Sequence, residues 1–163
     1  MFMKRSFLAV AIFTMMTAVA INAQNSDAGG KQLQGAWRIT VIPEEGGPPA
    51  FPVLFSFSKD GGVIETDQGP AAPDQPPSTF SAGLGEWQKV GKRTYIITYN
   101  QLQYDQAMNL IGTFRGRITA EVNPEMNSLT GELIVEFFDT SDTLLFTGGG
   151  MVQGYRLPVL GAH

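Results

Sequence analysis

The stretch FRGRITAEVNPEMNSLTGELIVEFF, residues 114–138, places two runs of alternating apolar and polar residues on either side of an NPEMNS turn. If Val122 lies opposite Leu129, one face of the hairpin is apolar and the other places Arg115 opposite Glu136. The apolar face then consists of the pairs Phe114–Phe137, Gly116–Val135, Ile118–Leu133 and Ala120–Gly131. Because a shift of one residue would reverse the two faces, the stretch predicts an antiparallel hairpin with a strongly specified register.

The rest of the chain repeats this pattern. Runs with period 2, rich in Val, Ile, Thr, Phe and Tyr, alternate with Gly, Pro, Asn and Asp clusters, and no long segment has helical periodicity. We predict eight strands, at residues 33–42, 52–58, 63–68, 83–90, 94–104, 110–122, 129–139 and 143–156. Two long Pro- and Gly-rich connections, 43–51 and 69–82, are predicted to be loops. Strands joined mainly by tight turns predict an all-β protein, either a meandering sandwich or, as we prefer, an eight-stranded antiparallel up-and-down β-barrel.

The N-terminus has the pattern of a secretory signal peptide. Lys4 and Arg5 precede an apolar run at 7–17, and Ala20 and Ala23 offer cleavage sites, of which Ala23 is preferred. The predicted organisation is a signal peptide at 1–23, a flexible leader at 24–32, a β-barrel domain at 33–157 and a C-terminal tail at 158–163. We therefore expect an exported protein, periplasmic or secreted, that is not inserted stably in a membrane.

Composition excludes several classes of site. The formal net charge is −4, and cleavage after Ala23 would leave nine basic against fifteen acidic residues, or −6. An acidic chain argues against nucleic acid as a partner. The chain has no Cys, and its one His is the C-terminal His163. The usual zinc and haem sites and a Ser-His-Asp triad are therefore not expected within one chain, and no metal or cofactor is predicted. The oligomeric state stays open.

The lumen residues follow from the register expected at each hairpin. With Ser58 opposite Val63, the lumen receives Phe55 and Phe57, along with Ile64, Thr66 and Gln68, whereas Glu65 and Asp67 point outward. With Tyr104 opposite Leu110, the lumen receives Asn100 and Tyr104, along with Ile96, Thr98 and Leu102. A slip of one residue would replace them with Tyr95, Ile97 and Tyr99. Trp87 would face Ile96 across a two-residue Gly91-Lys92 turn.

The expected ligand-binding residues are Phe55, Phe57, Trp87, Asn100, Tyr104, Phe114 and Phe137. Plain core packing is the competing interpretation for the aromatic members, because an eight-stranded barrel can be filled by its own side chains. Gly148-Gly149-Gly150 indicates a kink in the last strand, or room for a ligand or an aromatic ring. The sequence leaves open which face of that strand points inward. No carboxylate is expected in the lumen, which favours binding over acid–base chemistry.

Two short motifs suggest a family resemblance. Gly35-Ala36-Trp37 at the head of the first strand and Arg156 in GYRLP after the last one resemble the G-x-W motif and the C-terminal Arg of the lipocalin and wider calycin superfamily. The resemblance implies that Trp37 plugs the closed end of the barrel and that Arg156 packs across its indole. It also implies that the lumen binds a small apolar molecule. The chain departs from lipocalins in having no disulfide and no C-terminal helix segment after Arg156.

Three functions are compatible with this pattern. The first is an exported lipocalin-like barrel that binds or carries a small hydrophobic molecule, with Phe80 in the Pro-rich loop as a lid residue. The second is a metal-independent lyase, isomerase or cyclase that works inside the barrel, with Tyr104 as proton donor or acceptor and Asn100 orienting the substrate. The third is an envelope protein that binds a partner through an outer patch of Tyr95, Ile97 and Tyr99.

Overall fold

A computed structural model of the chain describes residues 32–66 and 78–158. The predicted signal peptide, almost all of the predicted leader, most of the Pro-rich loop with Gln68, and most of the C-terminal tail lie outside the described residues. In the described ranges, no helix has the length and apolar character needed to cross a membrane.

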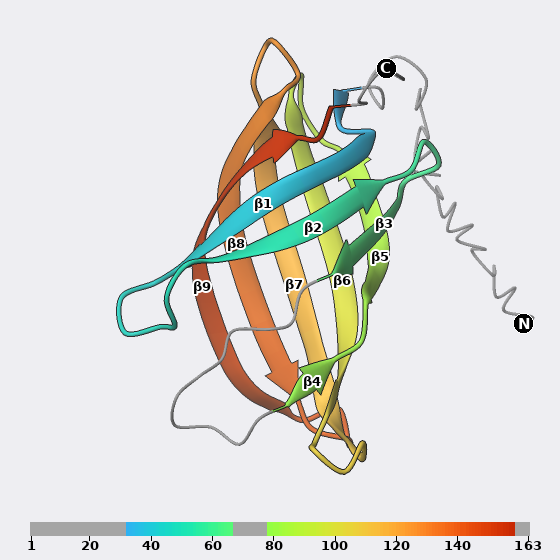
Figure 1. Cartoon of the computed structure of the whole chain (residues 1–163), viewed down its shortest axis with the longest axis vertical. Helices are drawn as coiled ribbons and strands as arrows, with labels where there is room; N and C mark the ends of the chain where they lie inside the picture. Colours follow the sequence, from blue (N-terminus) through green and yellow to red (C-terminus); the bar gives the residue numbers. More distant parts are fainter. Residues whose placement is uncertain (1–31, 67–77, 159–163) are drawn as a thin grey trace, which may run out of the picture.

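Eight strands form a closed antiparallel barrel, so the predicted fold class is confirmed (Figure 1). Their bounds are β1 Gly35–Pro43, β2 Phe51–Phe57, β3 Gly62–Thr66, β5 Gly83–Lys89, β6 Thr94–Tyr104, β7 Leu110–Val122, β8 Ser128–Phe138 and β9 Leu144–Arg156. Each strand pairs with its neighbour in the chain, and the pairing of β9 with β1 closes the sheet upon itself. Closure leaves no long sheet edge exposed.

A ninth short strand was not predicted. β4, Thr79–Phe80, pairs with the end of β6, where Thr79 lies opposite Tyr104. β4 and β5 pair with the same side of β6. The register of the β4–β6 pairing differs by one residue from that of the β5–β6 pairing. Part of the predicted loop 69–82 is therefore a continuation of the barrel wall, at the lower end of the barrel in Figure 1.

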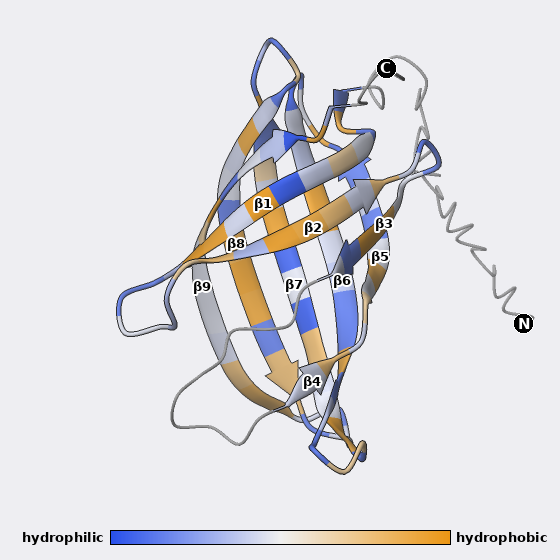
Figure 2. Ribbon diagram, in the orientation of Figure 1, coloured by the Kyte–Doolittle hydropathy of each residue, from blue (hydrophilic) through white to orange (hydrophobic). Residues whose placement is uncertain are grey.

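The core lies inside the barrel because the strands alternate apolar and polar residues (Figure 2). β7 and β8 pair as predicted, with Val122 opposite Leu129 and Arg115 opposite Glu136. The buried hydrophobic residues come from every one of the eight barrel strands. In β9, Val152 is fully buried, so its even-numbered residues face the lumen, which answers the question that the sequence left open.

The two ends of the barrel differ. The Trp37 end, as we name it, holds the start of β1 and the end of β9, with Trp37 and Leu33 fully buried. The β4 end is the opposite one, and it holds the β6–β7 and β8–β9 turns (Figure 1).

The β2–β3 hairpin departs from the predicted register by one residue. Phe57 lies opposite Val63 and Phe55 opposite Glu65. The Ser58 amide donates to the Gly62 carbonyl at 2.9 Å, which leaves a three-residue loop, and its last residue, Gly61, has φ +91°. This is the three-residue hairpin loop that ends in a left-handed glycine, not the four-residue loop that the sequence analysis assumed.

The β6–β7 hairpin begins as predicted and then shifts. Tyr104 lies opposite Leu110, but Gln103 lies opposite Gly112, so Ile111 is an extra residue in β7. This β-bulge reverses the orientation of the remainder of β6 relative to the prediction. The inward residues of β6 are therefore Tyr95, Ile97, Tyr99 and Gln101, all buried.

Candidate functional site

A line of aromatic rings runs along the lumen from the Trp37 end, where Phe57 lies opposite Gly35, to the β4 end. Phe55 lies 5.6 Å from Phe57 and 5.4 Å from Tyr99, measured between ring centroids. Tyr99 lies 6.0 Å from Phe114, which contacts Phe80 at 6.0 Å and Phe137 at 4.9 Å. Phe137 in turn lies 5.9 Å from Phe146. We call this set the aromatic column: Phe55, Phe57, Phe80, Tyr99, Phe114, Phe137 and Phe146.

Burial decreases along the aromatic column. Phe55 and Tyr99 are 2% and 4% exposed, whereas Phe114 and Phe137 are half-buried. Phe146 is 57% exposed although it has the same orientation in β9 as the fully buried Val152. The β4 end therefore presents an aromatic surface that faces inward and is reached by solvent.

Glu65 lies on the lumen side of β3, which corrects the expectation that the lumen holds no carboxylate. The register of the β2–β3 hairpin turns Glu65 inward and leaves Ile64 49% exposed on the outer face. Glu65 is 0% exposed. A Cβ atom at Gly83 would lie 2.8 Å from Glu65 Oε2 and 2.8 Å from Tyr99 Cδ2, so the carboxylate and the ring meet over this glycine.

Neither of the two polar residues expected in the lumen is buried there. Asn100 is exposed on the outer face of β6, where its side-chain oxygen accepts a hydrogen bond from Arg115 Nε at 3.3 Å. Tyr104 is half-buried at the end of β6, opposite Leu110. The structure places Gln101 and Tyr99 inside instead, because the bulge at Ile111 shifts the register. The same shift removes the outer patch of Tyr95, Ile97 and Tyr99, since all three are buried.

The aromatic residues expected in the lumen face it. Phe55, Phe57 and Trp87 are buried, and Phe114 and Phe137 are half-buried. Trp87 pairs with Ile97 rather than Ile96, because the β5–β6 turn is longer than two residues. Its indole N–H donates to the Ser58 carbonyl at 3.1 Å. Two register errors of one residue cancel for Trp87, so its orientation is as expected although its partner is not.

Trp37 and Arg156 lie opposite each other in β1 and β9. The guanidinium carbon of Arg156 is 4.6 Å from the Trp37 ring centroid, and the indole N–H donates to the Leu33 carbonyl at 2.8 Å. Arg156 also donates to the backbone carbonyls of Met126, Gln34 and Gln32. Burial lowers the pKa of Arg156 and raises the pKa of Tyr95, whose hydroxyl donates to Gln32. The contact implied by the resemblance is thus present, at the end opposite the exposed aromatic rings.

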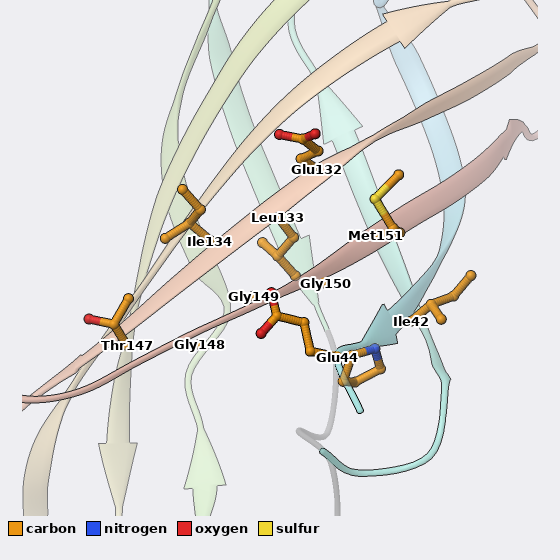
Figure 3. A pocket seen from close by; sticks show the side chains of 11 residues that line it. Ile42, Glu44, Glu132, Leu133, Ile134, Thr147, Gly148, Gly149, Gly150 and Met151 are labelled. Carbon is orange, nitrogen blue, oxygen red and sulfur yellow. The ribbon is translucent and has the colours of Figure 1, made fainter. Parts of the chain in front are cut away.

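The outer wall has a hollow of its own, of about 570 Å³, that the sequence analysis did not predict (Figure 3). Its floor is the triple glycine of β9, and its rim includes Ile42, Ile134 and Met151. Glu44 extends beside Gly149, where a Cβ atom would lie 2.6 Å from Glu44 Oε1. Gly148 instead leaves room for the ring of Phe146, as the glycine run indicated for an aromatic neighbour.

Glu65, Tyr99, Gln101 and Phe146 are lumen residues that the sequence analysis did not assign to the ligand, and Phe80 was expected only as a lid residue. For Glu65, the signal that could have found it is the Gly61-Gly62 pair, which is typical of a three-residue loop with a left-handed last residue. Among the described residues, no three His, Cys, Asp or Glu side chains come together as ligands for a metal.

Comparisons with protein-family models, with curated proteins and with solved structures found no match for this chain. The described barrel is compatible with a lipocalin-like fold.

Proposed function

We propose that the protein binds a small, mostly apolar molecule in its lumen, and that the molecule enters at the β4 end. The observation that carries this proposal is the exposure gradient along the aromatic column, from buried Phe55 to the 57% exposed Phe146. Ligand pockets are concave and lined mainly by apolar and aromatic side chains. A molecule seated between these rings would remove their exposed surface from water. Together with the predicted signal peptide, this describes an exported binding or carrier protein, periplasmic or secreted.

A fluorescence titration tests this proposal. The purified protein is titrated with N-phenyl-1-naphthylamine, an apolar probe that fluoresces when it leaves water. We expect Phe146→Ala to weaken binding by about fivefold or more, because the variant removes an aromatic face from the site. Phe138→Ala is the matched control, since Phe138 follows Phe137 in β8 but packs on the outer face. There the guanidinium carbon of Arg115 lies 4.7 Å from the centroid of its ring.

Two results would contradict the proposal: no binding of the probe, or equal losses in the two variants. Native mass spectrometry of the purified protein, compared with its denatured mass, supplies an independent measurement. A small molecule that co-purifies with the chain would identify a natural ligand or a mimic of one.

The second candidate function is an enzyme without metal that acts inside the barrel. It is favoured by Glu65, a buried carboxyl group beside a tyrosine ring in the lumen. Glu65 and Tyr99 then replace Asn100 and Tyr104, the residues first assigned to this role. Incubating any co-purified molecule with fresh protein separates the two functions: an unchanged mass, chromatographic retention and NMR spectrum support a binder, and a change in any of the three supports an enzyme.

A further inference from the structure

Glu65 gives the proposed ligand site a carboxyl group. Its carboxylate is fully shielded from solvent, on the lumen face of the second-last residue of β3. Phe55 lies opposite it in β2, and the Tyr99 ring shares the space over Gly83 with it. Glu65 is therefore in direct reach of the inner part of the aromatic column.

The lumen wall has a polar arc and an apolar arc. Besides Glu65 on β3, the polar arc contains Gln101, which is 3% exposed and donates to the Ser81 carbonyl at 3.1 Å. Gln103 follows on the same strand and donates to Ser78 Oγ at 3.1 Å. The apolar arc consists of the rings on β7, β8 and β9: Phe114, Phe137 and Phe146. A ligand that fits both arcs has an apolar body and a polar group at one side.

We propose that Glu65 recognises a protonated amine on the apolar ligand, an inference that rests on the proposed function. A carboxylate and an ammonium group attract each other more strongly in a low-dielectric lumen than in water, and their hydrogen bonds are charge-assisted. The faces of Phe55 and Tyr99 also attract a cation. The net charge of −4 favours the approach of a cationic ligand over an anionic one. Seating the amine requires a rotamer change of Glu65 or Tyr99, which is common at binding sites.

Three probes with the same ring system test this inference: 1-naphthylmethylamine, 1-naphthylmethanol and 1-naphthoic acid. Dissociation constants are measured by isothermal titration calorimetry at pH 7. We expect the amine to bind about tenfold more tightly than the alcohol, and the acid to bind more weakly than the alcohol. Glu65→Gln should bring the amine to within about threefold of the alcohol. Glu132→Gln, an exposed position on the outer wall, should change none of the three.

Several outcomes would overturn the inference. Equal binding of amine and alcohol to the natural chain would do so while leaving the proposed function intact, whereas failure of all three probes would count against both. An amine preference lost in Glu132→Gln, but kept in Glu65→Gln, would move the site to the outer hollow. If circular dichroism shows that Glu65→Gln does not fold, Glu65→Met, an uncharged side chain of similar volume, takes its place. In that case the comparison of amine with alcohol on the natural chain still decides.

Discussion

At the scale of single residues, the position of the Tyr99 ring depends on a glycine in the neighbouring strand. Gly116 lies opposite Tyr99 in the β6–β7 pairing, and a Cβ atom there would be 2.6 Å from the Tyr99 hydroxyl oxygen. The ring therefore lies against Gly116 on one strand, and against Gly83 and Glu65 on the other side. Glycine at 116 is required by close approach, not by backbone conformation.

Gly116→Ala should consequently destabilise the protein by about 1–3 kcal/mol, because the new methyl group overpacks a buried site. Urea-induced unfolding measures the change in the free energy of unfolding. In a Tyr99→Leu background the same substitution should cost much less, since the ring that it meets is gone. Equal costs in the two backgrounds would show that the Tyr99 ring is not the source of the effect.

At the scale of elements, the hairpins at the β4 end share one construction. Asp105 and Asp139 each precede a three-residue loop, and their carboxylates accept hydrogen bonds from backbone amides of Asn109 at 2.8 Å and Thr143 at 2.9 Å. The last loop residues, Met108 and Asp142, have φ values of 63° and 60°. A bulge follows one pair further along each ladder, at Ile111 and at Leu145. The bulges decide which side chains of these strands face the lumen.

The hydrogen bonds at Asp139 predict a pH dependence. Backbone hydrogen bonds from Thr143 and then Ser141 hold the pKa of Asp139 below its usual range. A depressed carboxyl pKa contributes stability above about pH 4, and this contribution is lost as the pH falls through the folded-state value. The natural chain should therefore exceed Asp139→Asn in stability at pH 7 and lose that advantage in acid. Urea unfolding of both proteins at a series of pH values measures this, and a gap that stays constant would contradict it.

At the scale of the whole molecule, one end of the barrel is closed by Arg156. Its guanidinium covers Trp37, and its hydrogen bonds join the end of β9 to the 123–127 turn and to the segment before β1. Three parts of the chain that are far apart in sequence thus meet at one side chain. The less buried rings of the aromatic column, Phe114, Phe137 and Phe146, lie toward the other end.

Arg156→Met should destabilise the barrel by about 1–3 kcal/mol, because it removes the cation over the indole and leaves the part-buried carbonyls of Gln32 and Gln34 without their donor. Arg38→Met is the matched control. Arg38 neighbours Trp37 in β1 but lies exposed on the outer face, with a 3.3 Å hydrogen bond to Tyr155, and its replacement should change stability by less than about 0.5 kcal/mol. Thermal and urea unfolding compare the two variants, and similar losses would refute a special role of Arg156.

The sequence by itself determined the eight barrel strands, the barrel class and the β7–β8 register. These depend on local alternation, and in the 114–138 stretch both faces agree on one pairing, apolar inside and Arg115 opposite Glu136 outside. The lumen aromatic residues Phe55, Phe114 and Phe137 follow from the same periodicity. Local pattern was sufficient wherever the two faces of a strand differ in character.

Only the tertiary structure decided that Glu65 and Tyr99 face the lumen. In β3 and β6 both faces carry apolar or aromatic residues, for example Val63 beside Ile64 and Ile96 beside Ile97, so periodicity alone does not distinguish the two faces. Which face points inward is decided by Gly61, which has a left-handed conformation, and by the bulge at Ile111. Each of them shifts the register of its hairpin by one residue. Closure of the barrel fixes these registers, because every strand must pair with a neighbour on both sides at once.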